Sequence, residues 1–161
     1  MPFENTTAIV TGGAQGLGLA IAEALAARGT KVAVFDLATD QTTAEVDRLR
    51  SRGGTVTGYT VDVSDRSQVK AAVDRGRVDL GPVLILINNA GIEQFGKFTE
   101  ITDEQWDRVM AINLRGPFIC TQEVLSDMVD AHWGRIVNIS SSSAQGGQSR
   151  MAAYVSSKAG V

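Results

Sequence analysis

The sequence is poor in the residue types that build disulfides, metal centres and membrane spans. Its 161 residues include one cysteine, Cys120, and one histidine, His132, so an internal disulfide is excluded and no metal cluster is expected. No apolar run approaches the ~20 residues that a transmembrane helix needs. The net charge of −3 argues against a nucleic-acid or anionic-membrane partner. Residues 1–10 contain Glu4 and no basic stretch, so we expect no signal peptide and a cytoplasmic location.

The composition fits one folded domain. Hydrophobic residues make up 43% of the chain and charged residues 20%, which is enough apolar material for a buried core and excludes a disordered tail. At roughly 150 residues per domain, the length allows a single domain over residues 1–161. The only biased stretch is the serine run at 140–143, and no repeat or linker is visible.

Short β-branched runs alternate with helical patterns along the chain, which indicates βαβ units around a parallel sheet. The predicted strands are 8–10, 31–35, 55–61, 83–87 and 135–139. The predicted helices are 17–25, 42–50, 64–73, 102–114, 117–131 and 151–161. Ser64 and Thr102 are predicted helix caps, with Gln105 completing a capping box after Thr102. Because parallel crossovers are right-handed, we expect an α/β fold with a Rossmann-like, doubly wound sheet in the strand order 3-2-1-4-5.

A glycine-rich turn joins the first predicted strand to the first predicted helix. It reads Thr11-Gly12-Gly13-Ala14-Gln15-Gly16-Leu17-Gly18. Gly12 permits the sharp turn, Gly16 lets the backbone approach a pyrophosphate, and Gly18 lets the helix pack closely on the sheet. Free N–H groups at the helix start then face the anion. We therefore predict a dinucleotide site rather than an ordinary glycine-rich turn, with cofactor contacts from Gly12, Gln15, Gly16, Leu17 and Gly18.

Asp36 ends the second predicted strand and lies 18 positions after Gly18. This is close to the ~20-residue spacing at which a carboxylate binds the adenosine ribose. Such a carboxylate accepts hydrogen bonds from the 2′-OH and repels a 2′-phosphate, and neither Gln15 nor Leu37 supplies a cation for that phosphate. We therefore predict NAD rather than NADP. The alternative is that Asp36 only opens the turn at 36–40.

Tyr154 and Lys158 lie four residues apart on the last predicted helix, so their side chains share one face. A free tyrosine titrates near pH 10, and a neighbouring ammonium together with a nicotinamide cation favours the phenolate. Tyr154 is therefore a candidate general acid/base for interconverting a carbonyl and an alcohol. A surface i,i+4 pair is the alternative interpretation of these two residues alone.

Five motifs, in this order, make the chain resemble the classical short-chain dehydrogenase/reductase family over essentially its whole length. They are the turn 11–18, Asn88-Asn89-Ala90-Gly91, Met110-Ala111-Ile112-Asn113, Gly134-Arg135-Ile136-Val137-Asn138-Ile139-Ser140-Ser141, and Tyr154-x-x-x-Lys158. The resemblance implies an NAD-dependent oxidoreductase that moves a hydride between nicotinamide and a small-molecule secondary alcohol or ketone. A 3-hydroxyacyl or 3-oxoacyl thioester is one such substrate. It also implies a homo-oligomer built through the long helices after the fourth and fifth strands.

The resemblance further implies a role for each site residue. Tyr154 would exchange the proton with the substrate oxygen, which Ser141 would hydrogen-bond, with Ser142 as the fallback. Lys158 would hold the nicotinamide ribose and favour the phenolate of Tyr154. Asn113 would anchor a water that links Lys158 to solvent. The remaining cofactor contacts would be Asp62, Val63, Asn89, Ala90 and Gly91, together with Tyr154 and Lys158.

Several other polar residues are expected near the site or in loops. Ser140 and Ser143 are expected to make loop hydrogen bonds. Some loop residues at the carboxyl edge of the sheet are expected to shape a substrate pocket; the candidates are Glu93, Gln94, Gln145, Gln148 and Arg150. Cys120, beside Phe118 and Ile119, is expected to be a small core residue.

The chain ends three residues after Lys158, whereas the family continues with further strands and a segment that covers the substrate. We therefore expect an NAD-binding Rossmann domain over 1–161 that is incomplete at its C-terminus and lacks the later strands. Strand 135–139 would be an unpaired sheet edge, and the last helix would fray and misplace the catalytic pair. The competing hypothesis is a truncated dinucleotide-binding module without turnover.

Overall fold

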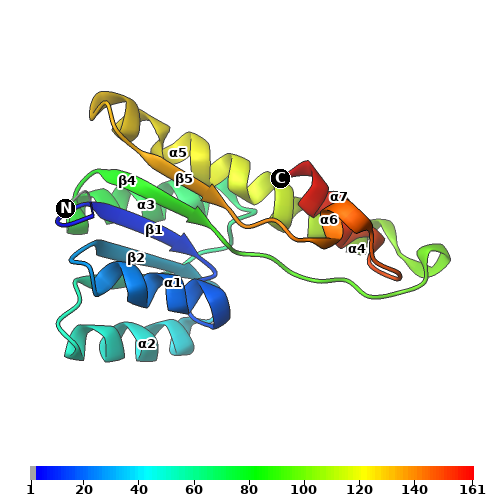
Figure 1. Ribbon diagram of the computed structural model, residues 1–161, viewed down its shortest axis with the longest axis horizontal. Coiled ribbons are helices and arrows are strands. Elements are labelled where there is room, and N and C mark those ends of the chain that lie inside the picture. Colours follow the sequence, from blue (N-terminus) through cyan, green and yellow to red (C-terminus); the bar gives the residue numbers. More distant parts are fainter. Residues whose placement is uncertain (1–2) are drawn as a thin grey trace.

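Five parallel strands form the sheet of the computed structural model, which describes residues 3–161 (Figure 1). The strands are β1 (Thr7–Thr11), β2 (Lys31–Asp36), β3 (Val56–Thr60), β4 (Val83–Asn88) and β5 (Arg135–Asn138). They lie in the order β3-β2-β1-β4-β5, and every neighbouring pair is parallel. This confirms the predicted Rossmann-like, doubly wound topology.

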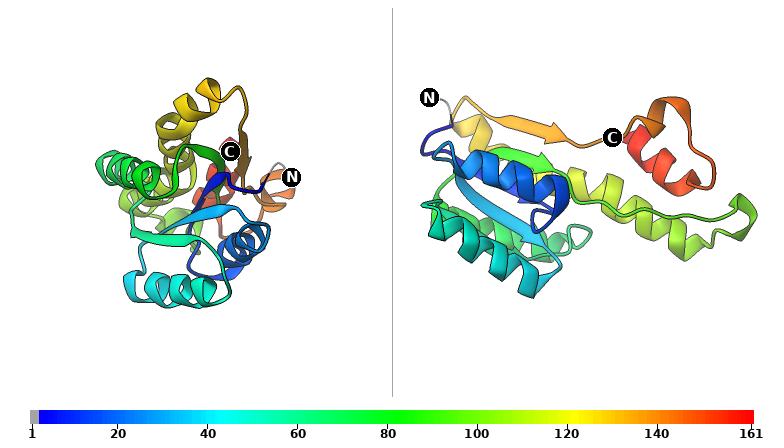
Figure 2. Two further views of the ribbon diagram at one scale, coloured as in Figure 1. Left: turned by 90° about the vertical axis from the view of Figure 1, so that its left-hand side faces the viewer. Right: turned by 60° about the horizontal axis from the view of Figure 1, so that its bottom comes forward.

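Helices follow the strands and cover both faces of the sheet (Figures 1 and 2). The α-helices are α1 (Gly16–Ala26), α2 (Thr39–Ser51), α3 (Arg66–Leu80), α4 (Asp103–Met110), α5 (Gly116–Asp130), α6 (Ser143–Gly146) and α7 (Ala152–Gly160). A 3₁₀ turn, η1 (Phe98–Glu100), precedes α4, and a π-helical turn, η2 (Ala111–Arg115), separates α4 from α5. Within residues 3–161, no helix has the length and apolarity that crossing a bilayer requires.

Two apolar cores, one on each face, hold the helices against the sheet. Successive residues of β1 alternate between them, because side chains of a strand point to opposite faces. Ala8 and Val10 join the core with α1 and α2, whereas Ile9 joins the core with α3 and α5. Cys120 lies in this second core, and burial raises the pKa of its thiol to about 12. The prediction of a core role for Cys120 is confirmed by this burial.

The third helix differs from its prediction at both ends. Its cap is Asp65, whose side chain accepts from the N–H groups of Ser67 and Gln68. Ser64 was the wrong choice, because its hydroxyl donates to Asp62 Oδ1 instead. The helix also continues past the predicted end at 73 to Leu80, since its buried face packs against the sheet on both sides of Gly76.

The long helical stretch after β4 breaks earlier than predicted. Thr102 and Gln105 form the predicted capping box at the start of α4. The register then changes in η2, which contains Asn113, and not at Pro117. Pro117 lies in the first turn of α5, a position at which proline is common because its fixed φ angle suits the helix. A π-helical turn inside a helix is often found at a functional site, so the position of Asn113 is notable.

The strand β5 lies at one edge of the described sheet. Among residues 3–161 its only paired neighbour is β4, which confirms the predicted edge position. All four of its residues are exposed, including Ile136 at 37% and Val137 at 45%. Beyond the carboxyl end of the sheet, α4, α6 and α7 pack together as a separate group (Figures 1 and 2). No observation tests the expected fraying of α7, which stays a prediction.

Candidate active site

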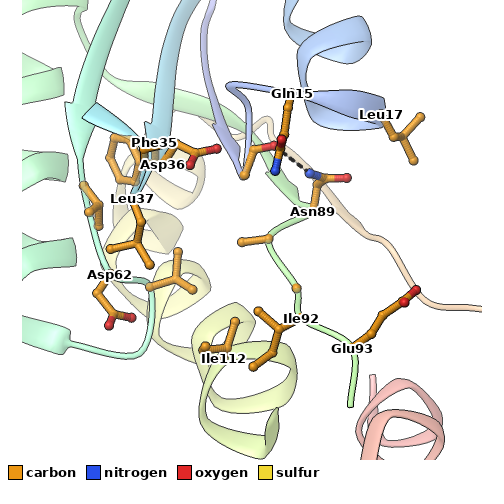
Figure 3. Close-up of a pocket in the computed structure, with 16 residues that line it drawn as sticks. Gln15, Leu17, Phe35, Asp36, Leu37, Asp62, Asn89, Ile92, Glu93 and Ile112 are labelled. Carbon is orange, nitrogen blue, oxygen red and sulfur yellow. Dashed lines mark hydrogen bonds between the residues drawn. The ribbon is translucent and has the colours of Figure 1, made fainter. Parts of the chain in front are cut away.

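A cavity of about 700 Å³ opens where the carboxyl ends of β1, β2 and β4 lie side by side (Figure 3). This is the crevice in which open α/β sheets bind ligands. The predicted cofactor contacts that line it are Gly12, Gln15, Leu17, Asp36, Asp62, Val63, Asn89, Ala90 and Gly91. The predicted contacts outside its lining are Gly16, Gly18, Tyr154 and Lys158. The prediction missed Phe35, Leu37, Ala38, Val61, Ile92 and Ile112 as lining residues; most of them adjoin a predicted contact at a strand end.

Two glycines of the turn have a backbone conformation that other residues rarely adopt. The φ angle is +62° at Gly12 and +53° at Gly16, in the left-handed region that favours glycine. A Cβ at Gly12 would lie 2.9 Å from Ala90 Cα, whereas one at Gly16 would meet no atom within 4 Å. The space beside Gly16 is therefore open at the start of α1. These features fit the close approach of an anion to the helix N-terminus.

Gly18 is required for space and not for its backbone angle. A Cβ there would overlap the carbonyl oxygen of Gly12 and lie 2.5 Å from Asn89 Nδ2. Asn89 Nδ2 donates to the carbonyl oxygens of Thr11 and Gly12, each at 3.0 Å, and the side chain points toward the turn in Figure 3. Thr11 Oγ1 in return accepts from the N–H groups of Asn89 and Ala90. The glycine turn is thus braced against the end of β4.

The Asp36 carboxylate lies at the end of the cavity beside Leu37 (Figure 3). Its Oδ2 accepts from Ala14 N and its Oδ1 from Ala38 N, both at 3.1 Å. These bonds fix the carboxylate and leave further lone pairs for a ligand hydroxyl. The bond to Ala38 also opens the following turn, so both predicted functions of this residue are compatible. The described residues that line the cavity include no lysine or arginine.

Lys158 is buried at 6% exposure and lies on the same helix as Tyr154. Its Nζ donates to the carbonyl oxygen of Ile139 at 2.7 Å and lies 5.9 Å from the centroid of the Tyr154 ring. Ser140 Oγ donates to the Lys158 carbonyl oxygen at 2.7 Å. Burial lowers the pKa of the Lys158 ammonium. The segment after β5 therefore holds this lysine at both its side chain and its backbone.

Asn113 is 1% exposed, and its side chain is fully engaged by neighbouring elements. Its Oδ1 accepts from Ile92 N at 2.8 Å, and its Nδ2 donates to Ile92 O at 2.9 Å. The second Nδ2 hydrogen goes to Ser157 Oγ at 3.0 Å. Asn113 thus ties the segment after β4 to α7.

Gly91 lines the cavity and lies close to the side chains of Asn113 and Lys158. A Cβ built on Gly91 would lie 3.3 Å from Asn113 Oδ1 and 3.4 Å from Lys158 Nζ. The side-chain ends of Asn113 and Lys158 therefore lie beside the cavity wall at this glycine, although neither residue lines the cavity itself.

The serine run contains two linked hydroxyls. Ser141 Oγ lies 2.8 Å from Ser143 Oγ and accepts from Ser143 N at 3.2 Å. Ser142 is exposed and makes no capping bond at the start of α6. Ser140 makes a loop hydrogen bond, as predicted, whereas Ser143 is the first residue of α6 and bonds to Ser141 just before that helix. The choice of Ser141 over Ser142 stays a prediction.

Of the five loop candidates for a substrate pocket, only Glu93 lines the cavity. The others lie outside its lining; they are Gln94, Gln145, Gln148 and Arg150. Gln145 lies on α6, so its predicted place in a loop is wrong. The loops that carry Gln94 and Arg150 are joined by a backbone hydrogen bond from Gly96 N to Arg150 O at 2.9 Å. Glu93 lies next to Ile92 at the end of the cavity opposite Asp36 (Figure 3).

The family model described as short chain dehydrogenase matches residues 6–161. The chain therefore belongs to the short-chain dehydrogenase family, as the motifs predicted.

Three known proteins illustrate this membership. The chain is 37% identical to the (2S)-[(R)-hydroxy(phenyl)methyl]succinyl-CoA dehydrogenase subunit BbsD of Thauera aromatica, over 100% of this chain and 64% of that protein. It is 41% identical to the acetoacetyl-CoA reductase of Rhizobium meliloti (strain 1021), over 97% of this chain and 63% of that protein. The crystal structure of an F189W actinorhodin polyketide ketoreductase with NADPH superposes with a TM-score of 0.93 at 36% identity, covering 96% of this chain and 60% of that one. The chain thus spans less than two thirds of the length of these relatives.

Proposed function

We propose that this chain carries the cofactor site and the proton-transfer residues of an NAD-dependent oxidoreductase that interconverts a secondary alcohol and a ketone. The observation that supports this most is the continuity of the site. Asp36 lies at one end of the cavity, and Gly91, which also lines it, adjoins Asn113 Oδ1 and Lys158 Nζ. The carboxylate proposed to bind the ribose and the lysine proposed to act with Tyr154 therefore both adjoin one cavity.

The residues around the cavity fit a dinucleotide. The open space beside Gly16 admits a pyrophosphate at the start of α1, and Asp36 would accept hydrogen bonds from the adenosine ribose. Asp62 and Val63 would adjoin the adenine, while Asn89, Ala90 and Gly91 would line the central portion. When bound, NAD supplies the nicotinamide carbon that takes up or returns a hydride.

The chain itself would move the proton. Tyr154 would exchange a proton with the substrate oxygen as general acid/base, and Ser141 would orient that oxygen by a hydrogen bond. Lys158 would hold the nicotinamide ribose; burial lowers the pKa of its ammonium, and its Nζ lies 5.9 Å from the centroid of the Tyr154 ring. Asn113 uses both Nδ2 hydrogens in protein contacts, so its side chain could bind the proposed water that links Lys158 to solvent only through Oδ1.

Two of the relatives are named for coenzyme A thioesters, which supports a 3-hydroxyacyl or 3-oxoacyl thioester as the substrate class here. The second candidate function is a dinucleotide-binding module without turnover. The observation that favours it is that none of Asn113, Ser141, Tyr154 and Lys158 lines the cavity. A panel of secondary alcohols, including 3-hydroxyacyl thioesters, separates the two candidates: NADH formation supports the enzyme, whereas NAD binding without NADH formation supports the module.

We predict that Asp36→Asn reverses the cofactor preference. NADH affinity should fall roughly 10- to 100-fold, because hydrogen bonds to a charged group contribute about 1.5–3 kcal/mol. NADPH affinity should rise, since repulsion of the 2′-phosphate is lost. Fluorescence titration with both cofactors measures the ratio. Asp40→Asn, at an exposed position at the start of α2, is the matched control. Wild-type chain that binds NADPH as tightly as NADH would overturn the proposed preference.

We further propose that a second copy of the chain packs on the exposed apolar side of α4, η2 and α5. An apolar groove there is lined by Met110, Leu114 and Phe118, and Phe118 is 56% exposed. Phe118→Glu should weaken self-association roughly tenfold or more, because the substitution replaces apolar contact area with a carboxylate that is costly to desolvate. Sedimentation velocity across a concentration series measures this. Val78→Glu, at another exposed apolar position on α3, should leave association unchanged; a wild-type chain that stays monomeric throughout would refute the proposal.

A further inference from the structure

Ser157 lies at the junction of α7 with the π-helical turn η2, and its exposed fraction is 0%. Its hydroxyl makes two hydrogen bonds to different elements. It accepts from Asn113 Nδ2 at 3.0 Å and donates to the carbonyl oxygen of Tyr154 at 2.7 Å. One buried side chain therefore contacts both Asn113 and the backbone of Tyr154, and it directly precedes Lys158.

The bond to Tyr154 alone would be ordinary. A helical serine often donates to a carbonyl three or four residues before it, with little consequence beyond a slight bend. The bond from Asn113 is different because it crosses between elements that are 44 positions apart in the sequence. Asn113 is itself fixed by both polar groups of the Ile92 backbone. Ser157 thus receives its hydrogen bond from a side chain whose position is already set by the segment after β4.

We propose that Ser157 is a positioning residue. It fixes the rotation of α7 about its axis and the position of α7 along that axis relative to Asn113, and so places Tyr154 and Lys158 beside the cavity. This inference rests on the proposed function of those two residues. Tyr154 and Lys158 flank Ser157 within one helical turn, so a small rotation of α7 displaces both together. Without the hydroxyl, a buried Nδ2 hydrogen of Asn113 loses its acceptor, and α7 loses this polar link to η2.

Three variants of the full chain separate this role from packing. Ser157→Ala removes the hydroxyl, and Ser157→Cys fills the space with a sulfur that accepts hydrogen bonds weakly. Ser156→Ala removes a hydroxyl from the exposed neighbouring position and serves as the control. We expect kcat for alcohol oxidation to fall about tenfold in both Ser157 variants, which corresponds to about 1.4 kcal/mol of lost transition-state stabilisation. In both Ser157 variants, KM for NAD should stay within about twofold of the wild-type value. In Ser156→Ala, kcat should also stay within about twofold, well below that tenfold decrease.

A double-mutant cycle tests whether Ser157 acts through Asn113. In an Asn113→Ala background, Ser157→Ala should lower kcat by much less than tenfold, because the shared hydrogen bond is already gone. Wild-type kcat in Ser157→Cys would assign Ser157 to packing alone and overturn the proposal. The proposal would also be overturned if Ser157→Ala lowered kcat by the same factor in the Asn113→Ala background as in the wild type.

A spectroscopic measurement needs no turnover. In a chain labelled with nitrogen-15 asparagine, the Asn113 side-chain amide is assigned by its loss in Asn113→Ala. Its hydrogen exchange should be slow in the wild type and in Ser156→Ala, and at least tenfold faster in Ser157→Ala. An unchanged exchange rate in Ser157→Ala would refute the link itself. If the wild type binds NAD but oxidises no alcohol, the proposed function fails, and the exchange rates still decide whether Ser157 holds Asn113.

Discussion

Tyr154→Phe is expected to abolish turnover while leaving dinucleotide affinity unchanged. The substitution removes only the hydroxyl that exchanges a proton with the substrate oxygen. Positioned general acid/base catalysis contributes about 10²–10⁴-fold to a rate, so kcat should fall by at least about two orders of magnitude. The ring that packs beside Lys158 Nζ is retained. Steady-state NADH formation and NADH fluorescence titration measure the two quantities separately.

The other tyrosine of the chain supplies the matched control. Tyr59 on β3 donates to Asp79 Oδ2 at 2.6 Å and lies in the core with its ring against Phe35. Tyr59→Phe deletes the same hydroxyl group and should lower the stability of the fold by about 1.5–3 kcal/mol, the contribution of a hydrogen bond to a charged group. Turnover should stay unchanged in that variant. A fully active Tyr154→Phe chain would refute the proposed proton transfer.

Gly18→Ala is expected to damage both the fold and the cofactor site. The added methyl group overlaps the Gly12 carbonyl oxygen and presses on Asn89 Nδ2, so backbone must move to admit it. Overpacking of this kind lowers stability by about 1–3 kcal/mol. Because the displaced oxygen belongs to the turn that is proposed to bind the pyrophosphate, NADH affinity should fall by at least about tenfold, or 1.4 kcal/mol. Thermal unfolding and NADH titration measure the two losses.

A glycine-to-alanine substitution at Gly76 should instead raise the stability of the fold. Gly76 lies within α3, and a Cβ built there meets no atom within 4 Å. Alanine in a helix is favoured over glycine by about 0.5–1 kcal/mol, so Gly76→Ala should raise the melting temperature without affecting NADH affinity. If Gly18→Ala melted and bound NADH like the wild type, the tight packing of the turn against β4 would be wrong.

The sheet is predictable from the sequence because its strands carry strong local signals. The run Val83–Ile87 is apolar at every position, as a strand covered on both faces must be, and it forms β4, which pairs with β1 and β5. Asp36 follows another such run and ends β2 at the predicted position. Strand order then follows from the handedness of crossovers. These features depend on neighbours in the sequence, which a single chain reveals.

Features that depend on distant partners are not predictable in this way. Serine and aspartate are both favoured helix caps, so the sequence alone does not distinguish Ser64 from Asp65. In the structure the Ser64 hydroxyl donates to Asp62, and Asp65 caps α3. The π-helical turn at Asn113 has no sequence signal comparable to Pro117, which drew the predicted break to the wrong place. Ser157 resembles an ordinary helical serine until Asn113 is placed opposite it. The catalytic motifs gave the identity of candidate residues, but not the hydrogen bonds that hold them.

The most direct test follows the hydrogen from alcohol to cofactor. The chain is incubated with NAD and a 3-hydroxyacyl thioester that carries deuterium on the carbinol carbon, and the mass of the NADH formed is measured. We predict NADH that is heavier by one deuterium, at a rate that Tyr154→Phe reduces by at least about two orders of magnitude. NAD binding without labelled NADH, across the panel of secondary alcohols, would contradict the enzyme and leave a dinucleotide-binding module.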